Sequence, residues 1–254
     1  MCTLVILRRP GHDWPLLLAA NRDEVRRRSA EPPARHWPDR PTVVAGLDHT
    51  GGGSWLGIND QAVVAAIMNR TGSLGPAPGK RSRGELVLEA LDHAKAKSAA
   101  GALADLDSNA YRPFNLVVAD TKDAYWLRHG GDGEIRVHVV PPGLHMLSDT
   151  ELDDSGHPRI RSYLQRFRSA EIPDPQHDHQ QTWQDLLASR TYPAEAGPEA
   201  AMNLEECPNG FGTVSSALIA VLAPGFASPP RWLHAAGPPD RFPFEPVDLG
   251  GVLN

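Results

Sequence analysis

Short apolar runs of strand length, each closed by turn-forming residues, restrict the fold of this 254-residue chain more than any other feature. Such runs, bounded by Gly, Pro, Asn and Asp, are typical of β-strands. We therefore predict strands over residues 2–8, 15–20, 42–46, 62–69, 114–120, 124–128, 134–140, 144–148, 213–222 and 232–235. The connections at 8–15 and 130–133 are short and rich in turn residues, which favours hairpins and antiparallel pairing.

Helical periodicity is confined to the middle of the chain. Ser82-Arg83-Gly84-Glu85 has capping-box spacing and precedes an apolar repeat up to residue 94. Further helices are expected from Pro158 to about 167, around 183–187, and, as a short one, over 99–106. Strands at both ends with helices between them predict an α+β layered fold. Without a repeat or a break in composition, we expect one domain over residues 1–254.

Charge and composition exclude several classes of partner. A formal charge of −6 and a pI near 6.0 give no reason to expect binding to nucleic acid or to an anionic membrane. The first apolar run is too short for a secretion signal, and no stretch approaches the roughly 20 apolar residues of a membrane span. The chain has two cysteines, Cys2 and Cys207, so we expect no disulfide framework and a cytoplasmic protein.

Cys2 is the candidate nucleophile. Methionine aminopeptidases remove Met1 when a small residue follows, and this would leave Cys2 with both a thiol and a free α-amine. An α-amine titrates near ~7.7–8.0 and can accept the thiol proton at neutral pH. One residue would then supply nucleophile and base. The alternative is that Cys2 is a small buried residue at the start of a strand.

Polar residues at the ends of two predicted strands are candidate partners of Cys2. The tetrad Asn21-Arg22-Asp23-Glu24 follows the second strand, where Asp23 could hold the Cys2 amine and Arg22 could lower a thiol pKa or bind a carboxylate. Asn69 ends the strand over 62–69, where a side-chain amide could stabilise an oxyanion. Ordinary turn roles remain the alternative for these residues. Between them, glycine-rich 51–59 contains Trp55, and no phosphate-loop signature follows it.

The ordered set of motifs resembles the NRDE family, the relatives of the transport-and-Golgi-organisation protein. Its motifs here are Cys2, Asn-Arg-Asp-Glu, Gly-Gly-Ser-Trp-Leu-Gly, Met-Asn-Arg, Ser-Arg-Gly-Glu, Pro-Phe-Asn-Leu and Phe-Gly-Thr, spread over residues 2 to about 222. The chain is more distantly similar to cysteine-type N-terminal nucleophile hydrolases of bile-salt and penicillin amides. That resemblance implies a four-layer αββα sandwich of two antiparallel sheets, with catalytic roles for Cys2, Asp23 and Asn69. The motifs also indicate substrate-binding roles for Asn21, Arg22, Trp55, Arg70 and Asn115.

The sequence departs from both patterns at particular positions. Bile-salt hydrolases have Arg before the Asn-x-Asp motif, where this chain has Ala20, and Arg22 lies inside the motif. NRDE relatives commonly have Arg where this chain has Val214, and often Asn where it has Asp149. A lost cation and an added carboxylate both weaken anion binding, so catalysis on an acidic substrate is less expected.

Two functions follow from the resemblance. The first is hydrolysis of a C–N amide bond of a small molecule through an acyl-thioester on Cys2, with no cofactor. The second is non-catalytic binding and trafficking of haem, or of acyl-CoA or lipid, with His36, His49, His93, His129, His138 and His145 as possible axial ligands. No metal site is expected, because His177-Asp178-His179 lacks two further ligands nearby.

Overall fold

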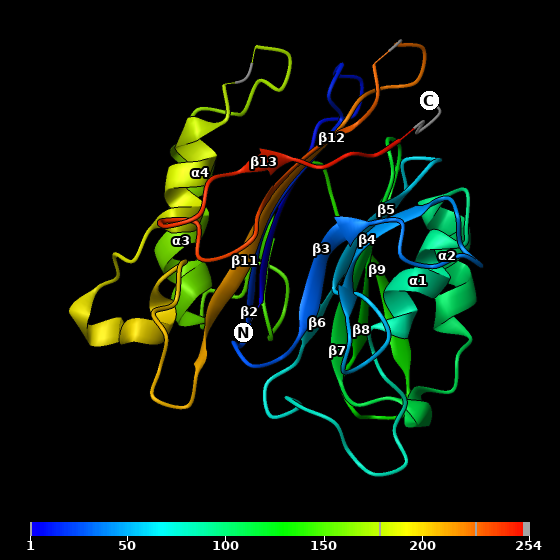
Figure 1. Ribbon diagram of the computed structural model, residues 1–254, viewed down its shortest axis with the longest axis horizontal. Helices are drawn as coiled ribbons and strands as arrows, with labels where there is room; N and C mark the ends of the chain where they lie inside the picture. Colours follow the sequence, from blue (N-terminus) through cyan, green and yellow to red (C-terminus); the bar gives the residue numbers. More distant parts are fainter. Residues whose placement is uncertain (1, 178, 227, 251–254) are drawn as a thin grey trace.

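The computed structural model describes residues 2–177, 179–226 and 228–250, and its core is two antiparallel sheets packed face to face (Figure 1). The six strands of sheet A lie in the order β10 (Gly143–Leu147), β1 (Thr3–Arg8), β2 (Leu16–Val25), β11 (Phe211–Val221), β12 (Arg231–Ala235) and β13 (Glu245–Pro246). The seven strands of sheet B lie in chain order, as β3 (Ala30–Ala34), β4 (Val43–Asp48), β5 (Leu56–Asn59), β6 (Val64–Asn69), β7 (Phe114–Ala119), β8 (Ala124–His129) and β9 (Ile135–Val139).

Helices cover the outer face of each sheet. The pair α1 (Glu85–Leu91) and α2 (Ala96–Ala104) lies on sheet B, and the pair α3 (Pro158–Ser169) and α4 (Gln181–Ala188) lies on sheet A (Figure 1). Short 3₁₀ turns occur at Ser108–Ala110, Ala194–Ala196 and Pro198–Ala200. The chain is therefore a four-layer αββα sandwich of the α+β class, as the resemblance implied.

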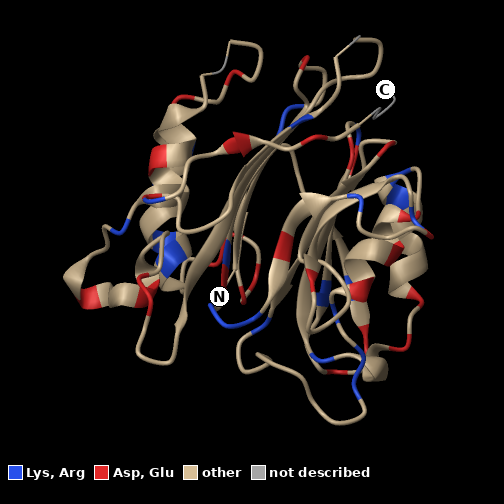
Figure 2. Cartoon of the chain, viewed as in Figure 1, with Lys and Arg blue, Asp and Glu red and all other residues tan. Residues whose placement is uncertain are grey.

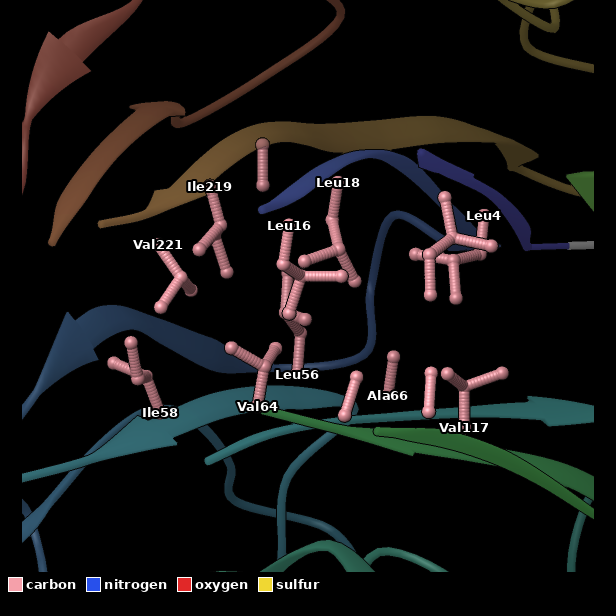
Figure 3. Packing of buried hydrophobic residues seen from close by; sticks show 14 of the residues in the cluster. Leu4, Leu16, Leu18, Leu56, Ile58, Val64, Ala66, Val117, Ile219 and Val221 are labelled. Carbon is pink, nitrogen blue, oxygen red and sulfur yellow. The ribbon is translucent and has the colours of Figure 1, made fainter. Parts of the chain in front are cut away.

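Strand β1 shows why its sequence is continuously apolar. Leu4 and Ile6 point into the layer between the sheets, while Val5 and Leu7 pack against the α3–α4 side. A strand buried on both faces has no solvent side to make polar. The layer between the sheets is filled from both directions: Leu16, Leu18 and Ile219 meet Ile58, Val64 and Val117 (Figure 3).

Sequence reasoning missed three strands and misplaced two local features. Strand β3 contains Pro32 and Pro33, which are tolerated because β3 is an edge strand. The four-residue β5 was also missed, as was the two-residue β13. The expected capping box does not form, because Gly84 is the N-cap of α1 and no side chain caps it. The Asn-Arg-Asp-Glu tetrad lies within β2 rather than after a strand, since pairing with β11 continues to Val25.

Among the described residues, no helix is both long enough and apolar enough to cross a membrane. Figure 2 shows acidic and basic residues interspersed over the helices and loops. A basic connection, residues 26–28, lies beside the N-terminal end and leads from sheet A to sheet B (Figures 1 and 2).

Candidate active site

Cys2 stands at the edge of the layer between the sheets. The β1–β2 register pairs Thr3 with Asn21, so Cys2 comes next to Arg22 at the start of the ladder. The Cys2 thiol lies 3.7 Å from the backbone oxygen of Asp23, and the Ser148 hydroxyl donates to the Cys2 carbonyl at 2.9 Å. The Cys2 side chain is half-buried and lines a cavity of about 300 Å³. The predicted nucleophile therefore faces a space large enough for a small molecule.

Three other predicted site residues line the same cavity. Arg22 comes from β2, Trp55 from the segment before β5, and Asn69 from the end of β6. Arg22 and Trp55 are stacked, with the guanidinium carbon 3.9 Å from the ring centroid. The cavity thus combines a thiol, a side-chain amide, a cation and an aromatic ring contributed by both sheets.

Two glycines bring Trp55 and the start of α1 to the cavity. A Cβ on Gly46 would lie 2.3 Å from the Trp55 ring, so only glycine lets the ring rest on β4. A Cβ on Gly53 would lie 2.3 Å from the carbonyl carbon of Gly84, where the Gly84 oxygen accepts a hydrogen bond from Ser54 at 3.0 Å. The glycine-rich motif therefore serves close packing of the cavity wall.

Asp23 is held rigidly beneath Cys2. Its carboxylate accepts hydrogen bonds from Arg159 Nη1 at 2.8 Å and from the Thr213 hydroxyl at 2.7 Å. Burial alone would raise the pKa of this carboxyl, but the neighbouring positive charges, with that of Arg159 foremost, and the hydrogen bonds from Thr213 and Arg159 together outweigh burial, so the pKa is lowered. Asp23 therefore stays ionised below the cavity.

Sequence reasoning did not find Arg159 or Thr213 as partners of Asp23. Arg159 lies one helical turn before Tyr163 and two before Phe167, both fully buried in α3. That i, i+4, i+8 spacing places Arg159 on the buried face of the helix and is the signal that could have revealed it. Thr213 is near the start of β11 and pairs with Asp23 across the ladder, which sequence alone does not disclose.

The surroundings of Cys2 keep its sulfur protonated. Burial raises the pKa of the Cys2 thiol above its ordinary value, and the negative charge of Asp23 acts in the same direction. The Arg22 guanidinium opposes this shift without overcoming it. A base must therefore remove the thiol proton before the sulfur can act as a nucleophile.

A second cavity of about 320 Å³ lies on the other side of the Arg22–Trp55 pair, since both residues line it too. Val214 and His234 are in its wall. Val214 occupies an irregularity in the β2–β11 ladder, where the register shifts between Thr213 and Ser215. The position where NRDE relatives commonly carry Arg thus faces the second cavity, and it is not part of the wall of the Cys2 cavity.

Asn21, Arg70 and Asn115 are not in the wall of this cavity, although Asn21 lines a smaller pocket together with Cys2, Arg22 and Trp55. The Asn21 amide donates to the carbonyls of Leu187 and Met202, both at 2.9 Å, which ties β2 to the helix layer. Asn115 is fully buried, and its amide oxygen accepts from Arg70 Nη1 at 2.8 Å. These contacts tie all three residues into the framework of the sandwich, and the substrate-binding roles expected for them stay predictions.

Asn115 also joins the sheets, because its amide nitrogen donates to the carbonyls of Ser148 at 2.9 Å and Thr150 at 2.8 Å. Asp149, within the same segment, lies 3.0 Å from His157 Nε2 and accepts from the Thr71 hydroxyl at 2.7 Å. Burial opposes ionisation of Asp149, but these partners lower its pKa. The carboxylate that replaces the usual Asn is therefore held by His157 and Thr71 and is not in the wall of the Cys2 cavity.

None of the six histidines proposed as haem ligands is among the described residues that line the Cys2 cavity. His145, for example, pairs with Asp153 at 2.7 Å, and buried His129 contacts the carbonyl of Glu134 at 3.2 Å. Among the described residues, no group of three or more His, Cys, Asp or Glu side chains is placed to hold a metal ion. Asp178 of the His-Asp-His tripeptide is outside the described residues.

Two antiparallel sheets between helix layers, with an N-proximal cysteine at the cavity, define the N-terminal nucleophile hydrolase-like class of fold. Solved structures agree. The Caenorhabditis elegans ortholog of N-acylethanolamine-hydrolyzing acid amidase gives a TM-score of 0.54 at 12% identity, covering 88% of this chain and 94% of that one. The C2A mutant of conjugated bile acid hydrolase from Clostridium perfringens gives a TM-score of 0.51 at 9% identity, covering 100% of this chain and 98% of that one. At these identities the likeness concerns the fold alone.

The chain belongs to the Transport and Golgi organisation 2 family, whose sequence profile matches residues 1–223. This confirms the NRDE resemblance. The "Transport and Golgi organization protein 2 homolog" of Bos taurus is 36% identical over 155 residues, and that of Homo sapiens is 34% identical over 155 residues. Each alignment covers 55% of this chain and 52% of the relative, so the match spans about half the length of these curated relatives.

Proposed function

We propose that this chain is an N-terminal-cysteine hydrolase that cleaves a C–N amide bond of a small molecule through an acyl-thioester on Cys2. The observation that carries the proposal is the opening of the Cys2 thiol onto a cavity of about 300 Å³ that Asn69 and Arg22 also line. The amidase and bile acid hydrolase folds support this reaction class by analogy of fold.

The need for a base that accepts the Cys2 thiol proton supports an N-terminal mechanism. The raised pKa of Cys2 demands a proton acceptor, and no histidine is present in the described cavity wall. Of the carboxylates there, Asp48 accepts from Arg28 at 2.7 Å and Glu24 lies 3.7 Å from Arg28. The α-amine that removal of Met1 would free is attached to the nucleophilic residue itself, and Asp23 would orient it.

The proposed reaction has two halves. The Cys2 sulfur forms a bond to the substrate carbonyl carbon as the α-amine takes the thiol proton, and the Asn69 amide with backbone N–H groups stabilises the oxyanion. Collapse of this intermediate breaks the C–N bond, and the ammonium gives its proton to the leaving amine. Water then attacks the thioester with the same amine as base, which breaks the C–S bond and restores the thiol.

We further propose that the protein acts in the cytoplasm, where a free thiol persists. The substrate is expected to be a small molecule because a cavity of this volume accommodates little more than one.

The test compares three forms of the full chain on electrophilic amide and β-lactam probes. Intact mass first establishes that Met1 is absent. We expect the processed protein to gain one acyl adduct at Cys2 and to release amine, and Cys2→Ala to do neither. A form with one serine inserted between Met1 and Cys2 keeps the thiol but blocks its amine, so it should lose turnover. Absence of a Cys2 adduct in protein lacking Met1 contradicts the proposal.

A further inference from the structure

Arg22 is a buried cation of the cavity wall. The residue is only 7% exposed, no described carboxylate forms an ion pair with it, and its guanidinium carbon lies 3.9 Å from the centroid of the Trp55 ring. Burial lowers the pKa of Arg22, although the negative charges of Asp48 and Glu24 act in the opposite direction. A buried charge that lacks a partner carries a desolvation penalty that a bound anion would relieve.

Arg83 presents a second cation, which is partly buried, to the same cavity. Its Nη1 donates to the Ser73 hydroxyl at 2.9 Å and to the Pro113 carbonyl at 2.8 Å, and no described carboxylate pairs with it. Burial, with the like charges of Arg112 and Arg28, lowers the pKa of Arg83 to about 10. Arg83 thus has no described carboxylate partner, and the positive charges of Arg112 and Arg28 around it would favour a bound anion.

The other cations of the cavity wall are already engaged. Arg28 binds Asp48 at 2.7 Å, and Arg81 binds Glu85 at 2.7 Å. Arg112 donates to three backbone carbonyls of the 72–76 segment within 3.0 Å, and Lys80 donates to a carbonyl at 2.5 Å. Six basic side chains therefore face two carboxylates in this wall. Arg22, Arg83, Arg112 and Lys80 have no described carboxylate partner, and of these Arg22 and Arg83 interact electrostatically with Cys2.

We infer that the substrate carries an oxyanion, a carboxylate or a phosphate, which Arg22 and Arg83 bind in the cavity beside Cys2. Planar guanidinium groups suit both oxyanions because they donate two parallel hydrogen bonds. The charges of both arginines act on the Cys2 sulfur, so the anion would lie near the reacting carbonyl. This inference rests on the proposed function, since it names the substrate class of the same site. It also revises the expectation that an acidic substrate is disfavoured.

Two alkylating agents that differ only in charge test the inference. Iodoacetate and iodoacetamide both form a C–S bond at the thiol as the C–I bond breaks, iodide leaves, and the thiol proton passes to solvent. Rates at Cys2 and at exposed Cys207 are measured separately by peptide mass in the full chain. The iodoacetamide rate corrects for any change in thiol reactivity, so the iodoacetate-to-iodoacetamide ratio at Cys2 reports the local charge.

We expect Arg83→Gln and Arg22→Gln each to lower this ratio about three- to tenfold at Cys2, as expected for one nearby charge. The matched control is Arg231→Gln, which removes an exposed arginine of β12 outside the cavity wall and should leave the ratio unchanged. Arg83→Lys keeps the charge and should retain most of the ratio, which provides a second measurement if Arg83→Gln fails to fold. Equal ratios in wild type and folded Arg22→Gln and Arg83→Gln overturn the inference.

Competition identifies the anion. Acetate or inorganic phosphate should slow the iodoacetamide reaction at Cys2 but not at Cys207, and the ion effective at the lower concentration names the group. Protection by neither overturns the inference. Alkylation requires neither turnover nor removal of Met1, so the two proposals fail separately. A charge preference without amide cleavage contradicts only the hydrolase, and cleavage of amides without a charge preference contradicts only the anion site.

Discussion

Arg159 donates a hydrogen bond from Nη1 to the Asp23 carboxylate at 2.8 Å, with both side chains almost fully buried. The same Nη1 atom donates to the Thr3 hydroxyl at 2.6 Å. One guanidinium therefore ties α3 to β1, which Cys2 immediately precedes, and to the neighbouring strand β2. The position of the thiol depends on a helix that begins more than 150 residues later in the chain.

Replacement of Arg159 by Met should destabilise the fold by about 3 kcal/mol, because it leaves a buried carboxylate without its cation. The free energy of unfolding in urea measures this. Arg161→Met, on the exposed face of the same helix, is the matched control and should change stability by less than about 0.5 kcal/mol. Similar losses in the two variants would show that the Asp23–Arg159 pair is not important for stability.

Acid should weaken the fold through His234. Burial lowers the pKa of His234 to about 4, so the unfolded chain, titrating near 6.5, binds the proton first. The stability from neutral His234 is complete above about pH 6.5 and is lost as pH falls toward about 4, by at most about 3 kcal/mol. Urea unfolding between pH 7.5 and 4.5 checks this. In His234→Leu the decline over this range should be shallower, and an identical decline contradicts the assignment.

The Gly53–Gly84 contact predicts the effect of a single methyl group. Gly53→Ala should cost about 1–3 kcal/mol, because its Cβ would meet backbone rather than a movable side chain. The matched control is Gly101→Ala in α2, where nothing lies within 4 Å and the helix should gain about 0.5–1 kcal/mol. Thermal midpoints of the two variants should therefore move in opposite directions.

Substitution of Asn69 should lower amide cleavage, whereas substitution of Asn115 should lower stability. Under the proposed function, Asn69→Ala removes an oxyanion donor and should lower amide cleavage by about 10²-fold with little loss of stability. Asn115→Ala leaves its buried partners, including the carbonyls of Ser148 and Thr150, without their hydrogen-bond donor. It should lower the free energy of unfolding by about 2–4 kcal/mol. Cleavage assays and urea unfolding are run on both variants. A large stability loss in Asn69→Ala would assign it a structural role instead.

Local patterning predicted the long buried elements well. The runs that became β1, β6, β7 and β11 were placed within about two residues, because strands with covered faces are continuously apolar. Edge strand β3 escaped notice because its two prolines read as a loop. Of the residues predicted for the site, the structure brings Cys2, Arg22, Trp55 and Asn69 together in one cavity wall. Sequence reasoning did not single out Arg159, Thr213 or Arg83, since their positions depend on contacts between distant segments.

The apolar interior of the sandwich borders the site of Cys2. Cys2, Ala20 and Trp55 pack directly on the apolar layer between the sheets. The space beside Cys2 is thus bounded in part by residues of this layer such as Leu4 and Leu56, which line a small pocket together with Cys2. Diversity at these interior positions among relatives would tune which molecules fit. A search for altered preference should begin there, inside the sandwich, as well as at the rim.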